Sequence, residues 1–570
     1  MSQPKSLAEI DLTPIPGKQY CTLEREWREE FIYFLMVDRF HDDLERKPVP
    51  GPNRSMGVKA PDNEFYGGKI KGITKNLDYI AGLGCTAIWL SPVFGNNQGA
   101  YHGYNINNYL DIDPHFGTKQ DLIDLVDAAH TYQRDDRPYP IRIILDVVIN
   151  HSGDNWSYPG GHSYNYIDDQ QFPFGFWREG REPFPTELRD QDYYHRKGNM
   201  NDFDASPQNQ HGDLSGLKDF ANEDYDPKGS EVINALIKIH AYWIREADID
   251  GFRVDAIKHL GAVPCSRFCS NIREYAYSLG KRGFFLFGEL AVPHDDIVDR
   301  YVGPNTSIKD NQTVFFGIDS VIDFPLAMGK YGDPNHRPLR EVLKGLAGPE
   351  TLFRRLEAQH NRALNRGEIG RYLVTIVDNH DTFWQPGRFG AGAPEDQIIG
   401  AIGFLLCALG TPCIYYGTEQ GFEGQGGDND VREAMFDRNK PGFNLLNSDC
   451  RIYKAIAEIA SIMRATQPLR FGRMYYRQIS GDGVHFGFPY GTAYTLAFSR
   501  LLYPSEVLIA YNVADQARDD FVIIDAALHA KGDHMTYLFG KSGQVEIQKS
   551  PEGAKFVQLR LEPHQFVILR

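Results

Sequence analysis

A run of nine residues from Gly251 to His259 places an arginine and an aspartate two positions apart. The run is typical of a short buried strand, in which alternate side chains share a face, so Arg253 and Asp255 should project together. A permanently charged guanidinium favours the ionised form of a neighbouring carboxylate. We therefore expect a lowered pKa for Asp255, which suits a nucleophile. A lone pair of this kind is also a common structural ion pair, so its meaning depends on partners elsewhere.

Three other polar clusters follow apolar runs in the same way. They are Asp146 to His151, Glu289 after the run 284–288, and Asp378 to Asp381. In a barrel of parallel strands, functional side chains lie at the carboxyl ends of the strands, so these groups should meet at one mouth. Any one cluster alone is most simply a polar strand end. Four in succession favour a shared site.

Three converging acidic groups suit glycoside hydrolysis. This reaction needs an ionised carboxylate, a protonated carboxyl group and support for a transition state that resembles an oxocarbenium ion. Asp255 would attack the anomeric carbon. The apolar run before Glu289 predicts a desolvated carboxyl group that keeps its proton, as a general acid must. Asp381 would hold sugar hydroxyl groups and favour a distorted ring.

The composition argues against several function classes. The chain has 570 residues, 42% of them hydrophobic, which is enough for one large domain with attachments. A net charge of -16 argues against a nucleic-acid partner. We find no run of about twenty apolar residues for a membrane and no secretory pattern at the start. The seven scattered cysteines form no disulfide framework, so we expect a cytoplasmic protein. The oligomeric state stays open.

Short apolar runs alternate with segments of helical periodicity over most of the chain. We expect strands at 31–37, 86–90, 141–149, 284–287, 314–323, 373–377 and 412–416, a further strand that opens at Gly251, and helices at 73–83, 119–130, 231–245 and 452–463. Thr118 should cap the second of these helices. Eight strands with intervening helices predict a (β/α)8 TIM barrel of the α/β class.

The alternation divides the chain into five segments. Residues 152–226 lack clear periodicity and are rich in Gly, Pro, Asp and Asn, which indicates a small inserted subdomain after the third strand. Beyond residue 470 only strands and turns are expected, which predicts a C-terminal antiparallel β-sandwich. The predicted segments are an N-terminal extension at 1–27, the first part of the barrel at 28–151, the insertion at 152–226, the second part of the barrel at 227–470 and the sandwich at 471–570.

Four motifs resemble the four short conserved regions of the α-amylase family, in that family's order. They are Asp146 to His151, Gly251 to His259, Phe287 to Leu290 and Val377 to Asp381. The resemblance covers nearly the whole chain, and the insertion corresponds to the B domain of that family. It implies a retaining hydrolase of α-1,4-glucosidic bonds in starch, glycogen or maltooligosaccharides, acting through a covalent glycosyl-enzyme intermediate. The implied roles are nucleophile for Asp255, acid/base for Glu289 and transition-state stabiliser for Asp381.

The resemblance also implies substrate contacts. The segment Tyr101 to Tyr104 is similar to one that places a histidine and a stacking tyrosine against the sugar, although a turn with packed aromatic rings is the alternative. Lys258 and His259 are similar to a pair in α-amylases and cyclodextrin glucanotransferases, with Lys258 beside the leaving group. The expected substrate contacts are His102, Tyr104, His151, Arg253, Lys258, His259 and His380.

A calcium ion is implied where the B domain meets the barrel. The matching positions are Asn150, Asp219 and the main-chain carbonyl of His259, which offer the oxygen ligands that calcium prefers. These residues could instead only form hydrogen bonds across the domain boundary. A second site near the first strand is doubtful because Lys69 stands where relatives often have an aspartate, and a lysine would repel the ion.

Two alternatives to the hydrolase remain. A glucanotransferase or a cyclomaltodextrinase-like enzyme would use the same carboxylates, with a sugar hydroxyl group as the acceptor in the case of transfer. An inactive carbohydrate-binding barrel belongs to a different class. The presence of Asp255, Glu289 and Asp381 argues against it.

Overall fold

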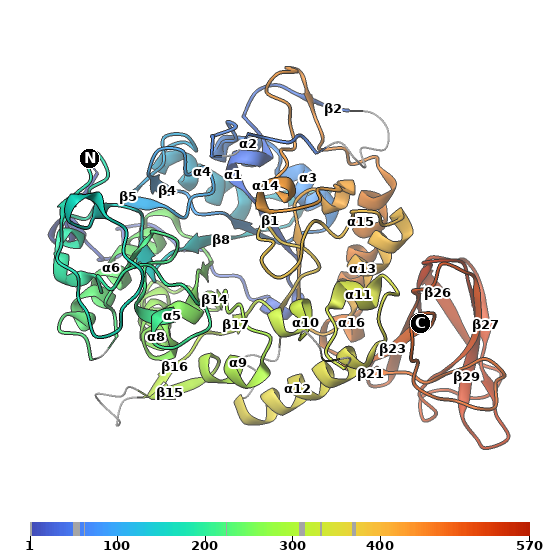
Figure 1. Ribbon diagram of the computed structural model, residues 1–570. Helices are drawn as coiled ribbons and strands as arrows, with labels where there is room; N and C mark the ends of the chain where they lie inside the picture. The colour runs from blue at the N-terminus through green and yellow to red at the C-terminus, as the bar shows by residue number, and fades with distance from the viewer. Residues whose placement is uncertain are drawn as a thin grey trace.

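The computed structural model describes residues 3–49, 57–61, 63–223, 225–306, 314–330, 333, 335–366 and 372–570. At its centre is a parallel sheet in the order β17-β14-β13-β8-β3-β1-β19-β18 (Figure 1). A parallel bridge from Ile322 to Val374 links the two edges, so the sheet is a nearly closed barrel and the predicted fold class is confirmed. The strands are β1 (Ile32–Leu35), β3 (Ala87–Leu90), β8 (Arg142–Val147), β13 (Gly251–Val254), β14 (Phe285–Gly288), β17 (Ser320–Val321), β18 (Val374–Thr375) and β19 (Thr411–Tyr415).

Helices surround this sheet (Figure 1). The Thr118 side chain caps α4 by accepting a hydrogen bond from the Asp121 amide, as predicted. The single helix expected at 73–83 is instead two, because the chain leaves helical geometry at Asn76. The main helices of the barrel layer are α2 (Ile70–Lys75), α3 (Leu77–Leu83), α4 (Lys119–His130), α6 (Gly229–Ala247), α8 (Ala262–Ser278), α12 (Glu350–Arg366), α13 (Glu395–Cys407) and α15 (Arg451–Ala465).

The sixth strand differs from its prediction as one run at 314–323. β16 (Val314–Phe316) pairs antiparallel with β15 (Pro304–Thr306), and β17 alone enters the barrel. Gly317 separates the two strands, and a Cβ atom there would lie 2.0 Å from the Tyr301 carbonyl oxygen. This close approach of backbone to backbone ends the run, and the sequence pattern alone does not reveal it.

The register of the sheet brings three chain segments level at the mouth of the barrel. Arg253 in β13 is paired with Asp146 in β8 on one side and with Phe287 in β14 on the other. Asp255 and Glu289 each follow the last residue of their strand. They therefore leave the barrel side by side.

The insertion between β8 and α6 begins and ends at the barrel. β9 (His151–Ser152) pairs antiparallel with β12 (Lys218–Asp219), so His151 lies opposite Asp219. Between them come β10 (Trp156–Ser157), β11 (Phe176–Trp177) and α5 (Gln208–His211), drawn in teal and green in Figure 1. The N-terminal segment lies against this insertion, where the Ser6 hydroxyl donates to Glu187 at 2.5 Å.

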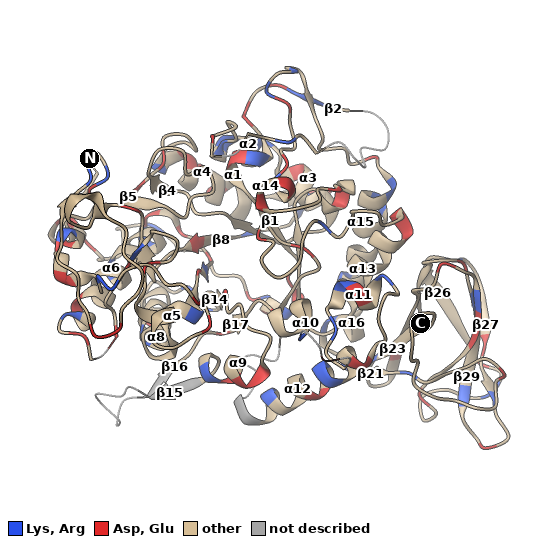
Figure 2. Cartoon of the chain, in the orientation of Figure 1, with Lys and Arg blue, Asp and Glu red and all other residues tan. Residues whose placement is uncertain are grey.

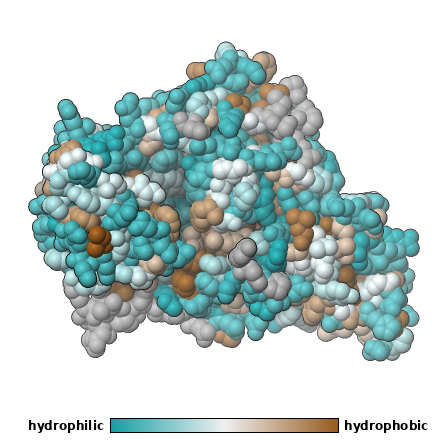
Figure 3. Space-filling view, viewed as in Figure 1, coloured by the Kyte–Doolittle hydropathy of each residue, from teal (hydrophilic) through white to brown (hydrophobic). Residues whose placement is uncertain are grey.

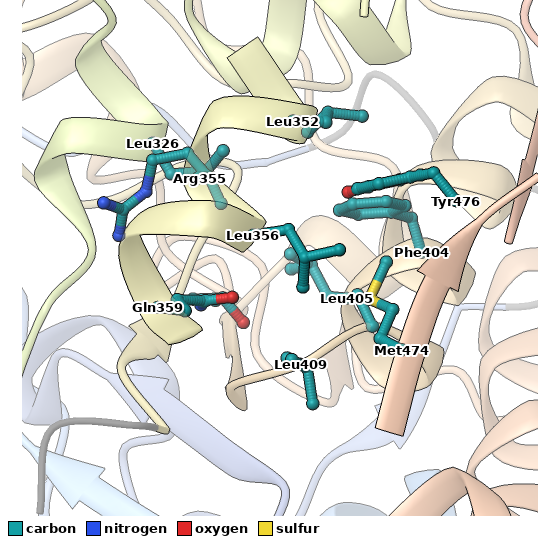
Figure 4. A pocket seen from close by; sticks show the side chains of 12 residues that line it. Leu326, Leu352, Arg355, Leu356, Gln359, Phe404, Leu405, Leu409, Met474 and Tyr476 are labelled. Atoms are coloured by element: carbon teal, nitrogen blue, oxygen red, sulfur yellow. The ribbon is translucent and has the colours of Figure 1, made fainter. Parts of the chain in front are cut away.

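The C-terminal region consists of two antiparallel sheets, as predicted, and lies at one side of the barrel (Figure 1). Figure 4 shows a small pocket where α12, α13 and β21 converge, with Leu356, Leu405 and Met474 among its apolar lining. One sheet contains β21 (Arg473–Tyr476), β23 (Thr495–Leu502), β24 (Ser505–Asn512), β30 (Phe566–Leu569), β26 (His534–Phe539) and β27 (Gln544–Glu546). The other contains β22 (Ile479–Ser480), β25 (Arg518–Ile523), β29 (Lys555–Leu561) and β28 (Gln548–Lys549).

The surface is polar and mixed in charge. Figure 2 shows Lys and Arg interspersed with Asp and Glu over the barrel helices, and Figure 3 shows a largely hydrophilic face with separate small hydrophobic patches. Within the described part of the chain, each helix is too short or too polar to cross a membrane.

Candidate active site

Arg253 is fully buried at the end of β13 and contacts three carboxylates. Its Nη1 atom donates to Asp146 Oδ1 at 2.9 Å and to Asp255 Oδ1 at 2.5 Å. Its Nη2 atom lies 3.0 Å from Glu289 Oε2. The pair recognised in the sequence is therefore part of a four-residue group, which we call the arginine cluster. Asp146 opens one of the sequence motifs but was not expected among the site residues.

The pKa values in the arginine cluster correct one prediction. Burial raises the pKa of Asp255 well above its ordinary value, although the Arg253 charge acts to lower it. Burial also raises the pKa of Asp146, to about 6. The expected lowering of the Asp255 pKa is wrong because burial, together with the charges of Glu289 and Asp146, outweighs the Arg253 charge. Such acids titrate as a unit.

The two acids predicted to do the chemistry keep a small exposure to solvent. The side chain of Asp255 is 9% exposed and that of Glu289 is 12% exposed, whereas Asp146 is fully covered. Glu289 Oε2 also accepts the backbone amide of Ala256 at 3.1 Å. The carboxyl groups are thus held in place from behind and are open toward the mouth of the barrel.

Asp381 follows β18 and is held by a second arginine. Arg432 Nη2 lies 2.8 Å from Asp381 Oδ1, and Arg432 Nε donates to the His380 carbonyl oxygen at 3.0 Å. His380 Nε2 lies 3.2 Å from the other Asp381 oxygen. With its side chain 22% exposed, Asp381 is the most open of the three predicted catalytic carboxylates.

Tyr104 connects the arginine cluster to His380. Its hydroxyl group donates to Asp146 Oδ2 at 2.9 Å and lies 3.0 Å from His380 Nε2. The rings of His102, Tyr104 and His380 are stacked in succession, with centroids 5.8 Å and 5.6 Å apart. Burial lowers the pKa of His102 to about 3 and that of His380 well below its ordinary value. Both imidazoles are therefore neutral hydrogen-bonding groups near pH 7.

Three other predicted contact residues lie toward the insertion. Lys258 Nζ donates to Asp204 Oδ1 at 2.5 Å, and His259 Nδ1 lies 2.6 Å from the Asn209 carbonyl oxygen. His151 is buried, and its Nε2 atom has no hydrogen-bond partner among the residues that the structure describes. Lys258 and His259 therefore join the barrel to the insertion.

Comparison with known proteins shows which family the chain belongs to. Residues 34–449, most of the chain, match the family described as the alpha amylase catalytic domain. The chain belongs to the alpha-amylase family of glycoside hydrolases.

Two curated relatives and one solved structure illustrate the family membership. An alpha-amylase of Streptomyces lividans is 28% identical over 87% of this chain and 58% of its own length. A cyclomaltodextrin glucanotransferase of Klebsiella oxytoca is 27% identical over 78% of this chain and 66% of its own length. The chain thus spans less than two thirds of each. The structure of alpha-amylase from Geobacillus thermoleovorans complexed with acarbose is 26% identical, with a TM-score of 0.68 over 96% of this chain and 99% of that one.

The structure brings together two of the residues predicted to hold calcium. Asn150 and Asp219 are each 1% exposed, and Asn150 Nδ2 donates to Asp219 Oδ1 at 3.2 Å. His259 belongs to α7 (Ile257–Leu260), which reaches the insertion through Asn209. The set combines an amide, a carboxylate and a main-chain carbonyl, one from each of three segments, and this fits a hard cation.

At the second calcium site, which the sequence made doubtful, the Asp38 carboxylate and the Lys69 ammonium both have protein partners. Asp38 already accepts the backbone amides of Tyr66 at 2.9 Å and Gly67 at 3.0 Å. Lys69, which was expected to disfavour an ion, donates to the His115 carbonyl oxygen at 2.6 Å. The positive charge of Lys69 is therefore held beside His115, where it would repel a cation.

Two members of this alpha-amylase site were missed from the sequence. Asp146 could have been found, since it opens a recognised motif at the end of a strand. Arg432 comes just after the short helix α14 (Asp428–Val431), and nothing in its neighbours along the chain marks it as a partner of Asp381. Only the fold brings Arg432 and Asp381 together.

Proposed function

We propose that the protein is a retaining glycoside hydrolase that cleaves α-1,4-glucosidic bonds in starch, glycogen or maltooligosaccharides. One observation carries the proposal: a single guanidinium, that of Arg253, contacts both Asp255 and Glu289, at 2.5 Å and 3.0 Å. Two carboxyl groups bound to one guanidinium favour the separation of about 5 to 5.5 Å of retaining enzymes over the about 6.5 to 9.5 Å of inverting ones.

In the first step, Asp255 reacts in its ionised form, which the Arg253 charge favours against the effect of burial on its pKa, and its oxygen forms a bond to the anomeric carbon as the glycosidic bond breaks. Glu289 gives its proton to the departing oxygen, so the leaving sugar departs as a neutral alcohol. In the second step, Glu289 takes a proton from water, and the water oxygen displaces Asp255. The retained configuration results from two inversions at one carbon.

Asp381 supports the sugar ring between these two acids. Its oxygens are held by Arg432 at 2.8 Å and His380 at 3.2 Å, which fixes the direction in which the carboxylate points. A carboxylate fixed in this way binds sugar hydroxyl groups more strongly as the ring distorts toward the transition state. The neutral His102, Tyr104 and His380 stack supplies further hydrogen-bonding groups beside it.

Two exposed aromatic rings lie near these groups in the chain and suit a glucan chain. Phe383 is 59% exposed and follows Asp381 by two residues, and Phe203 is 46% exposed with its ring 6.3 Å from that of His259. Flat apolar rings stack on the apolar faces of sugars. Such rings on both the barrel and the insertion favour a polymer or oligomer as substrate.

Calcium is the second part of the proposal. Asn150, Asp219 and the His259 carbonyl would hold the ion, and the contact between Asn150 and Asp219 at 3.2 Å supports this. When bound, the ion supplies positive charge that fixes the insertion to the barrel. A cytoplasmic location also remains a proposal. The seven free cysteines suit a reducing compartment, and cell fractionation would test it.

A transferase or cyclomaltodextrinase-like activity is the main alternative, and the relationship to a cyclomaltodextrin glucanotransferase favours it. The test is to incubate the protein with starch, maltotriose, pullulan and cyclodextrin and to follow products by chromatography and proton NMR. Hydrolysis should give linear maltooligosaccharides that appear first as α-anomers. Initial β-anomers would overturn retention. Cyclic or elongated products would show transfer, and binding without turnover would show an inactive carbohydrate-binding barrel.

A further inference from the structure

The insertion contains a second polar cluster that the proposed reaction does not use. His195, His211 and Glu223 offer ligand atoms that all lie within 4.8 Å of one another. His195 Nε2 also lies 3.1 Å from Asp226 Oδ2. We call these four residues the histidine cluster. They come from the segment between β11 and α6, and His211 ends α5 (Figure 1).

Two atoms of the histidine cluster are buried without a hydrogen bond, although one of them, Glu223 Oε2, lies 3.4 Å from His195 Nε2. Glu223 is 6% exposed, and its Oε2 atom has no hydrogen-bond partner among the residues that the structure describes. The same is true of His211 Nδ1 within this described part. A buried acceptor that lacks a partner costs about 1 to 3 kcal/mol. A bound cation would satisfy both atoms at once.

The other nitrogen of each imidazole is already oriented by a hydrogen bond. His195 Nδ1 lies 2.6 Å from Asp219 Oδ2, and His211 Nε2 lies 2.7 Å from the Tyr225 hydroxyl oxygen. Histidines that bind metals generally hold their second nitrogen in this way, because the bond fixes the ring and its tautomer. His195 Nε2 then points toward Glu223 Oε2, at 3.4 Å, and toward Asp226.

We propose that the histidine cluster binds a structural zinc-type ion through His195 Nε2, His211 Nδ1, Glu223 Oε2 and Asp226 Oδ2. Two imidazoles with two carboxylates suit zinc, whereas calcium prefers oxygen ligands alone. Tetrahedral zinc with bonds of about 2.0 to 2.1 Å needs ligand atoms about 3.4 Å apart. Atoms of His195, His211 and Glu223 lie within 4.8 Å of one another, so side-chain rotations would bring these three together, and Asp226 Oδ2 already lies 3.1 Å from His195 Nε2.

A set of four protein ligands leaves no open position, so the ion would hold structure rather than perform chemistry. It would join α5 to the chain just before α6 (Gly229–Ala247), where the insertion returns to the barrel. The site shares no ligand with the calcium set of Asn150, Asp219 and His259. Asp219 acts here only by orienting His195.

The test uses the full-length protein after its metals have been removed. Titration with Co²⁺ should produce the visible absorption of a tetrahedral ion, and Zn²⁺ should displace it at one equivalent per chain. His211→Ala should weaken Zn²⁺ binding by at least about tenfold. His162→Ala is the matched control, because this exposed histidine lies in the same insertion outside the cluster, and its binding should equal that of the wild type.

A second variant keeps the test decisive if His211→Ala does not fold. Tyr225→Phe retains the His211 ring but removes its orienting bond, and should weaken Zn²⁺ binding by about tenfold. The proposal is overturned if the wild type binds no Zn²⁺, if the variants bind it as tightly as the wild type does, or if excess Ca²⁺ displaces it. None of these results depends on turnover of a glucan, so the hydrolase proposal is tested separately.

Discussion

The arginine cluster and the histidine cluster have the same charge pattern in different settings. Arg253 contacts Asp146, Asp255 and Glu289 within 3.0 Å. His195 contacts the three carboxylates of Asp219, Glu223 and Asp226 within 3.4 Å. In each case one buried cation holds three acids together against their mutual repulsion.

The two clusters differ in the chemical nature of their cation. A guanidinium keeps its charge at any ordinary pH and cannot bind a metal, so the acids around Arg253 remain free to react. An imidazole can exchange its proton for a metal ion, and its acids then become ligands. Arg253 also stands on β13, a strand paired on both sides, whereas His195 lies outside the regular elements of the insertion. The same charges therefore suit catalysis in one place and assembly in the other.

The largest effect is expected from removing the nucleophile of the arginine cluster. Asp255→Asn keeps the size of the side chain but lacks the attacking oxygen anion, so kcat should fall by at least about 10³-fold on starch. The Tm should stay close to that of the wild type, because one of three crowded acids is neutralised. Asp296→Asn, at a side chain 75% exposed, is the control and should keep full activity. Appreciable hydrolysis by Asp255→Asn would remove Asp255 from its role.

The next largest effect is expected from replacing Arg253, the permanent cation of the arginine cluster. Arg253→Met leaves three buried carboxylates without their partner, which should lower the free energy of unfolding by about 3 to 5 kcal/mol in urea titrations. Arg253→Lys should recover part of this stability but little activity, because one ammonium cannot hold both Asp255 and Glu289 as a planar fork does. Arg300→Met, at a side chain 69% exposed, should cost at most about 1 kcal/mol. Equal stabilities for the two methionine variants would contradict the comparison.

The sequence was sufficient for the barrel and for residues that belong to local motifs. Asp255, Glu289 and Asp381 each end an apolar run, and the fold places all three at the carboxyl ends of barrel strands. Their chemical roles stay predictions. The apolar runs also located the strands, except for the run expected at 314–323. There Gly317 separates β16 from β17, because the Tyr301 backbone lies too close to position 317 for a side chain.

What the sequence could not predict depends on contacts between distant segments. The raised pKa of Asp255 arises from burial and from Glu289 and Asp146, which share Arg253, and the three acids lie in or directly after three different strands. The histidine cluster is drawn from an insertion with little regular structure, so no periodic pattern marks its members. Arg432 likewise meets Asp381 only through the fold.

A smaller effect separates the two proposed metal sites. In metal-free protein, added Ca²⁺ should raise the Tm of the wild type, since a ligand at 100 times its Kd contributes about 2.7 kcal/mol. The rise should persist in His211→Ala, which alters only the histidine cluster, and should be much reduced in Asn150→Ala. Differential scanning calorimetry would measure all three proteins. A Ca²⁺ response lost in His211→Ala would mean that the two sites are one.

The smallest effect concerns pH and the third acid of the arginine cluster. Burial raises the pKa of Asp146 from its ordinary value of 3.8 to about 6, so between these values the folded protein binds more protons than the unfolded chain. The contribution of Asp146 to stability must therefore fall as pH rises through this window, and the loss must persist above it. Asp146→Asn cannot ionise. Its unfolding free energy relative to the wild type should rise by about 1 to 3 kcal/mol between pH 4 and pH 7.5. A difference in unfolding free energy that stays constant over this range would show that Arg253 fully compensates the burial of Asp146 and would contradict the prediction.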